Sequence, residues 1–194
     1  MDYRDTTRRL NDYRRQIRGL RAEMRQLQAA VEPDPVQDYR FLTSAGEVAL
    51  SDLFGDKADL FVIHNMGVGC NACTLWADGF NGLVPHLENR AAFVVSSPNN
   101  PEMQETIKAE RGWRFRMVSH QGSSFAEDMG YRNPEGRWRP GVSVFRRADG
   151  QIFRVSDTSF EPGDDFCTAW HLFDMLAEGS AGWMPKRHYE GEAA

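Results

Sequence analysis

The sequence predicts a three-layer α/β fold with a mixed central sheet, preceded by a long N-terminal helix. Apolar residues recur with a helical period over residues 3–27, and short β-forming runs alternate with helical segments after residue 39. Two runs within residues 142–157 predict an antiparallel hairpin, which makes the sheet mixed. With 194 residues, the chain is long enough for one compact domain and a terminal extension.

The N-terminal helix is predicted from side chains spaced alternately three and four residues apart, with a width typical of a coiled-coil seam. The stripe consists of Tyr3, Thr6, Leu10, Tyr13, Ile17, Leu20, Met24 and Leu27. Eight arginines within residues 1–28 outnumber the four acids there, so the helix needs a partner surface. That surface is either its own domain or a second copy of the chain, in which case the protein is a homodimer.

The clearest boundary in the chain is the segment Glu32-Pro33-Asp34-Pro35. Each proline lacks an amide hydrogen and pushes the preceding residue out of helical backbone space. We therefore expect an N-terminal amphipathic helix over residues 1–31, as a possible dimerisation arm, and a single domain over residues 32–194.

The predicted elements after this boundary follow an order that resembles the thioredoxin fold; doubly wound sheets begin similarly, and the antiparallel hairpin near the end favours the thioredoxin arrangement. A small hairpin is expected at residues 39–42 and 47–50, followed by a strand at 60–64, a helix at 71–88, a strand at 91–97, a helix at 101–111 and a strand at 115–119. A second hairpin is expected at 142–147 and 151–157 across an Asp-Gly turn of type I′, then a closing helix at 163–178 and an irregular tail from residue 179.

Composition and charge narrow the class of protein. No early apolar region follows the basic N-terminus, and no run of about 18 apolar residues occurs, so we expect no signal peptide, no membrane span and a cytoplasmic location. The net charge is −5, and the N-terminal arginines are interleaved with an apolar pattern, so nucleic-acid binding is not expected. Three cysteines are too few for the disulfide framework of a secreted domain.

Two cysteines, Cys70 and Cys73, lie where a predicted buried strand passes into a predicted helix. The unpaired amides and positive dipole end of a helix N-terminus stabilise a thiolate, so Cys70 is the expected nucleophile. Cys73, three residues later on the same face, is the expected resolving thiol. This predicts a dithiol-disulfide oxidoreductase that acts on a disulfide-bearing or thiol substrate, is reset by an external thiol reductant, and uses no cofactor.

A binding module is the alternative function. Two thiolates with His64, Met66 or His120 suit copper(I), whereas zinc would need further ligands that the sequence does not offer. A protein with this fold could also lack catalytic activity and act through its N-terminal helix as a dimer.

Several other residues are candidates for the site. His64 ends the strand before the dithiol and either passes a proton to or from Cys73 or bonds to the backbone. Trp76 and His120 are candidate substrate contacts, as are Arg139 and Pro140. Thioredoxin folds carry a cis-proline beside the dithiol at the point just before such a strand, so Pro140 is expected to be that cis-proline, with an ordinary proline at the edge of a strand as the alternative. Cys167 is expected to be a small buried apolar residue rather than a redox partner.

The block Cys70-Asn71-Ala72-Cys73-Thr74-Leu75-Trp76-Ala77-Asp78-Gly79-Phe80-Asn81-Gly82, with Pro140-Gly141-Val142-Ser143-Val144-Phe145 downstream, resembles the DUF899 family of thioredoxin-like predicted dithiol-disulfide oxidoreductases. The resemblance covers most of residues 5–175 and implies the fold and the redox chemistry, but no substrate. Asn71 replaces the proline common between the two cysteines of the family, and only Gly67-Val68-Gly69 stands where relatives carry a longer acidic loop.

Overall fold

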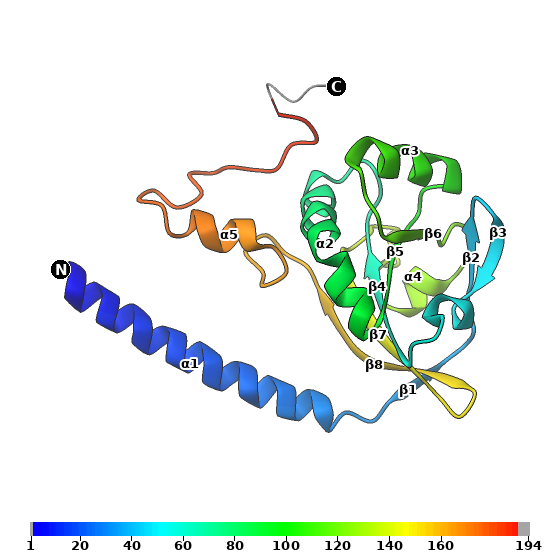
Figure 1. Ribbon diagram of the computed structural model, residues 1–194, viewed down its shortest axis with the longest axis horizontal. Helices are drawn as coiled ribbons and strands as arrows, with labels where there is room; N and C mark the ends of the chain where they lie inside the picture. Colours follow the sequence, from blue (N-terminus) through cyan, green and yellow to red (C-terminus); the bar gives the residue numbers. More distant parts are fainter. Residues whose placement is uncertain (1, 190–194) are drawn as a thin grey trace. The chain divides into compact units, whose positions relative to one another are not determined.

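The computed structural model describes residues 2–189 and divides into two compact units between Asp34 and Pro35. The first unit contains a single long helix, α1 (Tyr3–Ala29), which ends shortly before Pro33 as the sequence predicts. The second unit holds a central sheet with helices on both faces (Figure 1). Within the described residues, no helix combines the length and the apolar character that a membrane crossing requires.

The sheet has eight strands in the order β1-β8-β7-β4-β5-β6-β2-β3. The strands are β1 (Asp34–Val36), β2 (Arg40–Thr43), β3 (Gly46–Ala49), β4 (Asp59–His64), β5 (Ala92–Ser97), β6 (Arg116–Ser119), β7 (Gly141–Ala148) and β8 (Gln151–Ser159). The central strands β4, β5 and β6 are parallel, whereas β7 runs antiparallel to β4 and β2 runs antiparallel to β6. The sheet is therefore mixed, as the sequence predicts.

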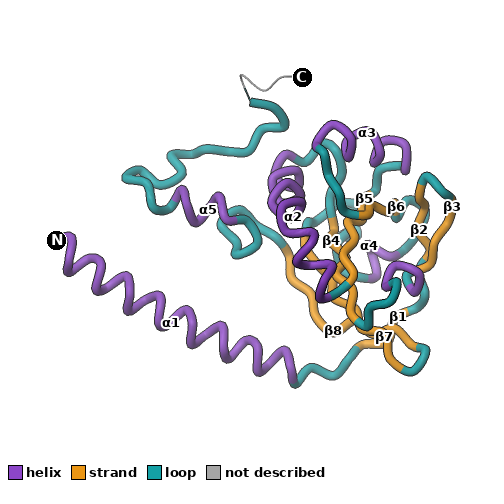
Figure 2. Tube along the Cα trace, viewed as in Figure 1, coloured by secondary structure: helices purple, strands orange, loops and turns teal. Residues whose placement is uncertain are grey.

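Helices cover the two faces of the sheet and make three layers (Figure 2). The helices of this unit are α2 (Asn71–Arg90), α3 (Pro101–Arg111), α4 (Phe125–Asp128), α5 (Thr168–Phe173) and the 3₁₀ turn η1 (Ser51–Phe54), of which α5 lies to the side of α2. Trp76 and Phe80 of α2 pack with Ile63 on one face of the sheet. Phe125 of α4 packs with Val62 on the other face. Because side chains alternate along a strand, β4 supplies residues to both clusters and is buried on both sides.

Capping and turn residues place several elements as predicted. Asn100 caps α3 by accepting a hydrogen bond from the Met103 amide at 2.8 Å, and Gly112 ends that helix with a left-handed φ of 63°. The β7–β8 turn has φ of 50° at Asp149 and 74° at Gly150, as a type I′ turn requires. The sequence-based prediction of this hairpin is confirmed.

The closing helix is shorter than predicted, because α5 covers only Thr168–Phe173 rather than residues 163–178. The Asp164 carboxylate accepts hydrogen bonds from the Glu161 amide at 3.1 Å and the Phe166 amide at 2.9 Å. These bonds form a local turn that competes with a helical start. The chain after α5 follows turns and packs Trp183 against Phe173, with ring centroids 4.8 Å apart.

Candidate active site

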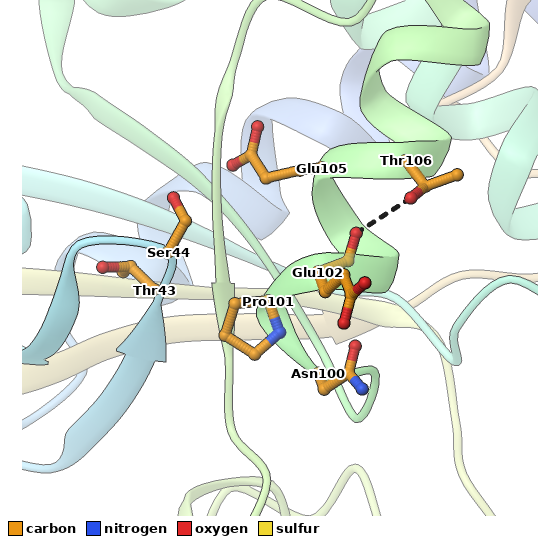
Figure 3. Close-up of a pocket in the computed structure, with 7 residues that line it drawn as sticks. All are labelled: Thr43, Ser44, Asn100, Pro101, Glu102, Glu105 and Thr106. Carbon is orange, nitrogen blue, oxygen red and sulfur yellow. Dashed lines mark hydrogen bonds between the residues drawn. The ribbon is translucent and has the colours of Figure 1, made fainter.

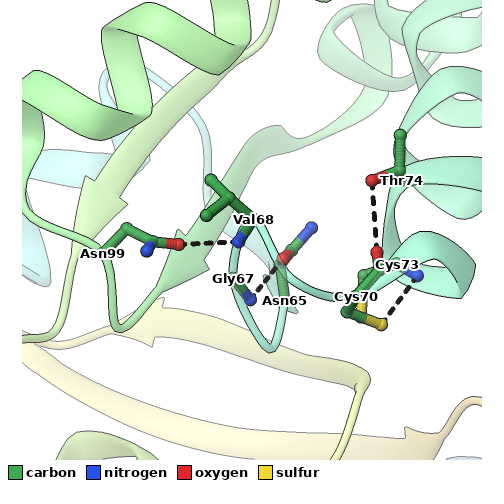
Figure 4. The surroundings of a disulfide bond; sticks show 7 residues. All are labelled: Asn65, Gly67, Val68, Cys70, Cys73, Thr74 and Asn99. Carbon is green, nitrogen blue, oxygen red and sulfur yellow. Dashed lines mark hydrogen bonds between the residues drawn. A yellow bond between two sulfur atoms is a disulfide. The ribbon is translucent and has the colours of Figure 1, made fainter. Parts of the chain in front are cut away.

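Cys70 and Cys73 lie at the amino end of α2 and are joined by a disulfide (Figure 4). Their Cα atoms are 5.2 Å apart, within the ordinary range for a disulfide. Cys70 is the N-cap residue of the helix, and its sulfur accepts a hydrogen bond from the Cys73 amide at 3.0 Å. The Cys70 sulfur is therefore bonded to an amide of the first helical turn that has no partner within the helix. Such an environment stabilises a thiolate.

The two cysteines differ in exposure. The Cys73 side chain is buried, with 3% of its surface exposed, whereas Cys70 is partly exposed. The Thr74 hydroxyl donates to the Cys70 carbonyl at 3.1 Å and ties the first turn of α2 together. Cys70 is therefore the more accessible cysteine of the pair.

Two asparagines hold the loop between β4 and the dithiol (Figure 4). Asn65 accepts a hydrogen bond from the Gly67 amide at 2.8 Å, and Asn99 accepts one from the Val68 amide at 3.0 Å. The Cys70 amide donates to the Gly67 carbonyl at 3.0 Å. The backbone of Cys70 is therefore anchored to the carboxyl ends of β4 and β5. Sequence reasoning singled out neither asparagine.

His64 lies on the face of the sheet opposite α2. Its ring stacks on Tyr131, with centroids 3.7 Å apart, and on Phe125, and its Nε2 atom forms a hydrogen bond with Ser143 Oγ at 2.8 Å. Burial lowers the pKa of His64 well below its ordinary value, and the nearby His120 and Arg154 act in the same direction. The structure thus places this imidazole, neutral at pH 7, away from the face that carries the dithiol helix.

His120 belongs to the same buried polar group as His64. Its Nδ1 atom forms a hydrogen bond with Ser96 Oγ at 2.7 Å, and its ring packs against Trp138. Burial lowers the pKa of His120 to about 4, with a further contribution from the positive charge of Arg132. Neither His64 Nδ1 nor His120 Nε2 has a hydrogen-bond partner among residues 2–189.

Trp76 is a core residue beside the dithiol. Its side chain is 3% exposed, its ring lies 5.5 Å from that of Phe160, and its Nε1 atom donates to Asp164 Oδ1 at 3.2 Å. The indole therefore fixes the segment after β8 to the first turns of α2. Cys167 is also buried in this region and forms no disulfide.

The predicted cis form of Pro140 is wrong, since no peptide bond in the described chain is cis. The Pro140 carbonyl accepts the Phe160 amide at 2.9 Å, which continues the β7–β8 ladder past Gly141 with trans geometry. Arg139 is exposed and lines a cavity of about 650 Å³ together with Arg132 and Glu127.

A further hollow, of about 830 Å³, lies between the β2–β3 turn and the first turns of α3 (Figure 3). It is lined by Thr43, Ser44, Asn100, Pro101, Glu102, Glu105 and Thr106. None of the candidate site residues lines it, so it does not belong to the dithiol site. The described part of the chain holds no group of three or more His, Cys, Asp or Glu side chains arranged to bind a metal ion.

The residues that follow the cysteines in the conspicuous block have structural partners. Asp78 accepts hydrogen bonds from Arg111 and, at 2.8 Å, from Trp113 Nε1. Asn81 accepts the Arg114 amide at 2.8 Å and donates to the Gly112 carbonyl at 3.1 Å. The block therefore fixes α2 to the connection between α3 and β6. The sequence alone did not reveal this role, because the partners lie more than thirty residues away.

Comparison with known protein families identifies the family of the chain. Residues 8–189 match the family model described as "Bacterial protein of unknown function (DUF899)". The chain belongs to the DUF899 family. No curated protein matches the sequence. The resemblance inferred from the dithiol block is therefore confirmed for the family, whose description names no activity.

Solved structures that resemble this DUF899 protein include several peroxiredoxins. A peroxidoxin from Mycobacterium tuberculosis has a TM-score of 0.55 and 20% identity, covering 66% of this chain and 84% of its own. The reduced Prx3 of Vibrio vulnificus has a TM-score of 0.55 and 11% identity, covering 69% and 89%. A hypothetical protein from Sinorhizobium meliloti 1021 has a TM-score of 0.53 and 13% identity, covering 81% and 88%. At these identities the likeness shows the thioredoxin-like fold.

Proposed function

We propose that this DUF899 protein is a dithiol-disulfide oxidoreductase. The Cys70 thiolate attacks a substrate disulfide, forms a mixed disulfide and releases one substrate thiolate. The Cys73 thiolate then attacks the Cys70 sulfur, which closes the internal disulfide and releases the second substrate thiolate. An external thiol reductant supplies the two electrons and two protons that reopen the disulfide.

The observation that carries this proposal is the asymmetric placement of the two sulfurs. Cys70 caps α2, is partly exposed, and accepts a hydrogen bond from the Cys73 amide at its sulfur. Cys73 is buried and lies close enough to form a disulfide with Cys70. Helix N-termini lower the pKa of a thiol, and a buried second thiol resolves the mixed disulfide without competing for the substrate. The peroxiredoxin neighbours support thiol-based redox chemistry in general terms.

The copper(I) alternative gains no support from the geometry. His64, the ligand expected to join the two thiolates, forms a hydrogen bond with Ser143 and stacks on Tyr131 on the face opposite α2. A soft cation held by the cysteines alone would compete with closure of the disulfide. We therefore retain copper binding as an outcome of the test.

The test compares turnover of the parent protein with that of Cys70→Ser and Cys73→Ser in a disulfide-reduction assay, with bound copper measured on the same samples. We expect Cys70→Ser to lose turnover and Cys73→Ser to accumulate a mixed disulfide at Cys70. Cys167→Ser is the matched control, because Cys167 is buried and unbonded, and it should retain turnover. Full turnover in both single variants, or stoichiometric copper uptake without turnover, would contradict the proposal.

We further propose that the chain acts in the cytoplasm as a homodimer that pairs through residues 3–27. A single helix cannot bury its own apolar stripe, so the seam from Tyr3 to Leu27 calls for a partner. A reducing compartment would supply the thiol reductant that the reaction requires.

A further inference from the structure

The C-terminal part of the second unit carries an unusual excess of negative charge. Residues 161–178, which we call the acidic segment, contain five carboxylates and no lysine or arginine. Asp164 is engaged by Trp76 and by two backbone amides, whereas Asp174 and Glu178 are exposed. Asp165 lies 3.4 Å from His171 Nε2 within the same segment, so the negative charge that the proposal uses is that of the exposed Asp174 and Glu178.

The acidic segment also exposes large apolar side chains. Leu172 is 58% exposed, Met175 is 77% exposed and Leu176 is 60% exposed. Asp174 stands directly between Phe173 and Met175, and Glu178 follows Leu176 by two residues. Exposed apolar groups can mark an interaction site, and the neighbouring carboxylates favour a partner that carries positive charge.

The helix α1 has the complementary composition. Over Tyr3–Ala29 it carries eight arginines and three acids beside its apolar stripe. Two of the acids already pair within the helix, Asp5 with Arg8 and Asp12 with Arg15. If two copies of α1 paired with each other, two strongly positive surfaces would face each other, and the flanking charges would oppose the seam.

We propose that α1 of one copy docks on the acidic segment of a second copy. The inference rests on the proposed homodimer and names the surface that each helix covers. The apolar stripe of α1 packs on the exposed Leu172, Met175 and Leu176, and its arginines face the flanking carboxylates. A twofold arrangement makes this contact twice, so the assembly closes as a dimer.

Ionic strength distinguishes this contact from a pairing of α1 with α1. Salt screens charges over about 10 Å at 0.1 M and about 3 Å at 1 M. Attraction between arginines and carboxylates weakens on screening, whereas repulsion between two basic helices is relieved by it. The first experiment therefore measures the dimer dissociation constant of the full chain at 0.1 M and 1 M sodium chloride, by light scattering or analytical ultracentrifugation.

We expect dissociation to become at least about tenfold easier at 1 M salt. A dimer that tightens with salt overturns the inference but leaves the homodimer intact. A monomer at both salt concentrations overturns both. The dissociation constant is measured without disulfide turnover, so the result does not depend on the proposed enzymatic reaction.

The second experiment exchanges charges between the two surfaces. Asp174→Arg combined with Glu178→Arg should weaken the dimer about tenfold or more, because α1 then meets like charge. Adding Arg18→Glu and Arg25→Glu, which lie seven residues apart on one side of α1, should restore it. Glu88→Arg with Glu105→Arg is the matched control, since both positions are exposed and lie outside the acidic segment.

We expect the four substitutions on the two surfaces to leave the fold intact. Circular dichroism and thermal unfolding check this for each variant. Loss of the dimer in the acidic-segment variant, with recovery in the four-residue exchange, supports the contact. An unchanged dimer in the acidic-segment variant, equal loss in the control, or no recovery in the exchange overturns it.

Discussion

At the scale of single residues, Gly67 sets the path of the loop that leads to the dithiol. Its φ is 101°, and a Cβ atom there would lie 2.6 Å from Asn99 Oδ1, the acceptor of the Val68 amide. An alanine at this position is strained and also displaces the asparagine that anchors the loop. The position of Cys70 relative to α2 thus depends on a residue that carries no side chain.

We predict that Gly67→Ala destabilises the protein by about 1–3 kcal/mol and shifts the midpoint potential of the disulfide. The matched control is Gly69→Ala, because a Cβ atom at Gly69 meets nothing within 4 Å and its φ is not positive. Urea unfolding measures the stability, and equilibration in glutathione buffers measures the potential. Identical behaviour of the two variants would show that the loop geometry does not govern the dithiol.

The buried histidines predict how stability depends on pH. The pKa of His120 falls from an ordinary value of 6.5 to about 4 in the folded protein, and that of His64 is also lowered. Between about pH 4 and pH 6.5, the unfolded chain therefore binds more protons than the folded chain does. The free energy of unfolding is therefore highest above about pH 6.5. It decreases as the pH falls towards 4, by about 3 kcal/mol for His120 alone.

The measurement is urea unfolding at intervals from pH 7.5 to pH 4, compared between the parent, His120→Leu and His86→Leu. His86 is the exposed histidine of α2 and serves as the control. The slope of stability with pH should flatten in His120→Leu and remain in His86→Leu. The carboxylates Asp59 and Asp128 have lowered pKa values, so their contribution falls away at lower pH and does not mask the effect. Equal slopes in all three proteins would contradict the assignment.

At the scale of elements, local rules predicted most of the fold. Apolar runs of β-forming residues located β4 and β5, and the Asp149-Gly150 step located the β7–β8 turn. Each of these signals acts within a few residues of the chain, so tertiary contacts did not override it.

The parts that sequence reasoning missed have both local and long-range causes. The side-chain bonds of Asp164 shortened the closing helix, and strand alternation placed His64 on the face opposite α2. The position of the dithiol was predictable because it needs only a strand-to-helix junction. The anchoring of the dithiol loop by Asn99 was not predictable, because Asn99 follows β5 whereas the loop follows β4.

The contacts of Asp78 and Asn81 predict a structural role for the block that follows the cysteines. Asp78→Ala removes the partner of Arg111 and of the Trp113 indole, and should destabilise the protein by about 1–3 kcal/mol. The reactivity of Cys70 should change little, because no hydrogen bond of Asp78 involves the dithiol loop. Thermal unfolding and the rate of Cys70 alkylation test the two halves of this prediction. A variant of normal stability with a strongly altered alkylation rate would assign Asp78 to the site instead.

At the scale of the whole molecule, we expect the second unit to carry the redox chemistry and α1 to carry the dimer contact. The second unit has its own sheet and two hydrophobic clusters, whereas the first consists of α1. We predict that removal of residues 1–30 yields a folded monomer that keeps the redox properties of the dithiol. Light scattering gives the mass, and circular dichroism gives the fold. An unchanged dimer mass after truncation would refute pairing through α1.

The central claim is that the two sulfurs at the start of α2 exchange electrons reversibly, with Cys70 the more reactive thiol. The most direct measurement is alkylation of the reduced full chain with a limiting reagent across pH 4–9, with the modified cysteine identified by mass spectrometry. We predict modification at Cys70 first, with a midpoint below the ordinary thiol value of about 8.5, and full protection of both sulfurs after oxidation. Preferential alkylation of Cys73, or a midpoint at or above the ordinary value, would contradict the account.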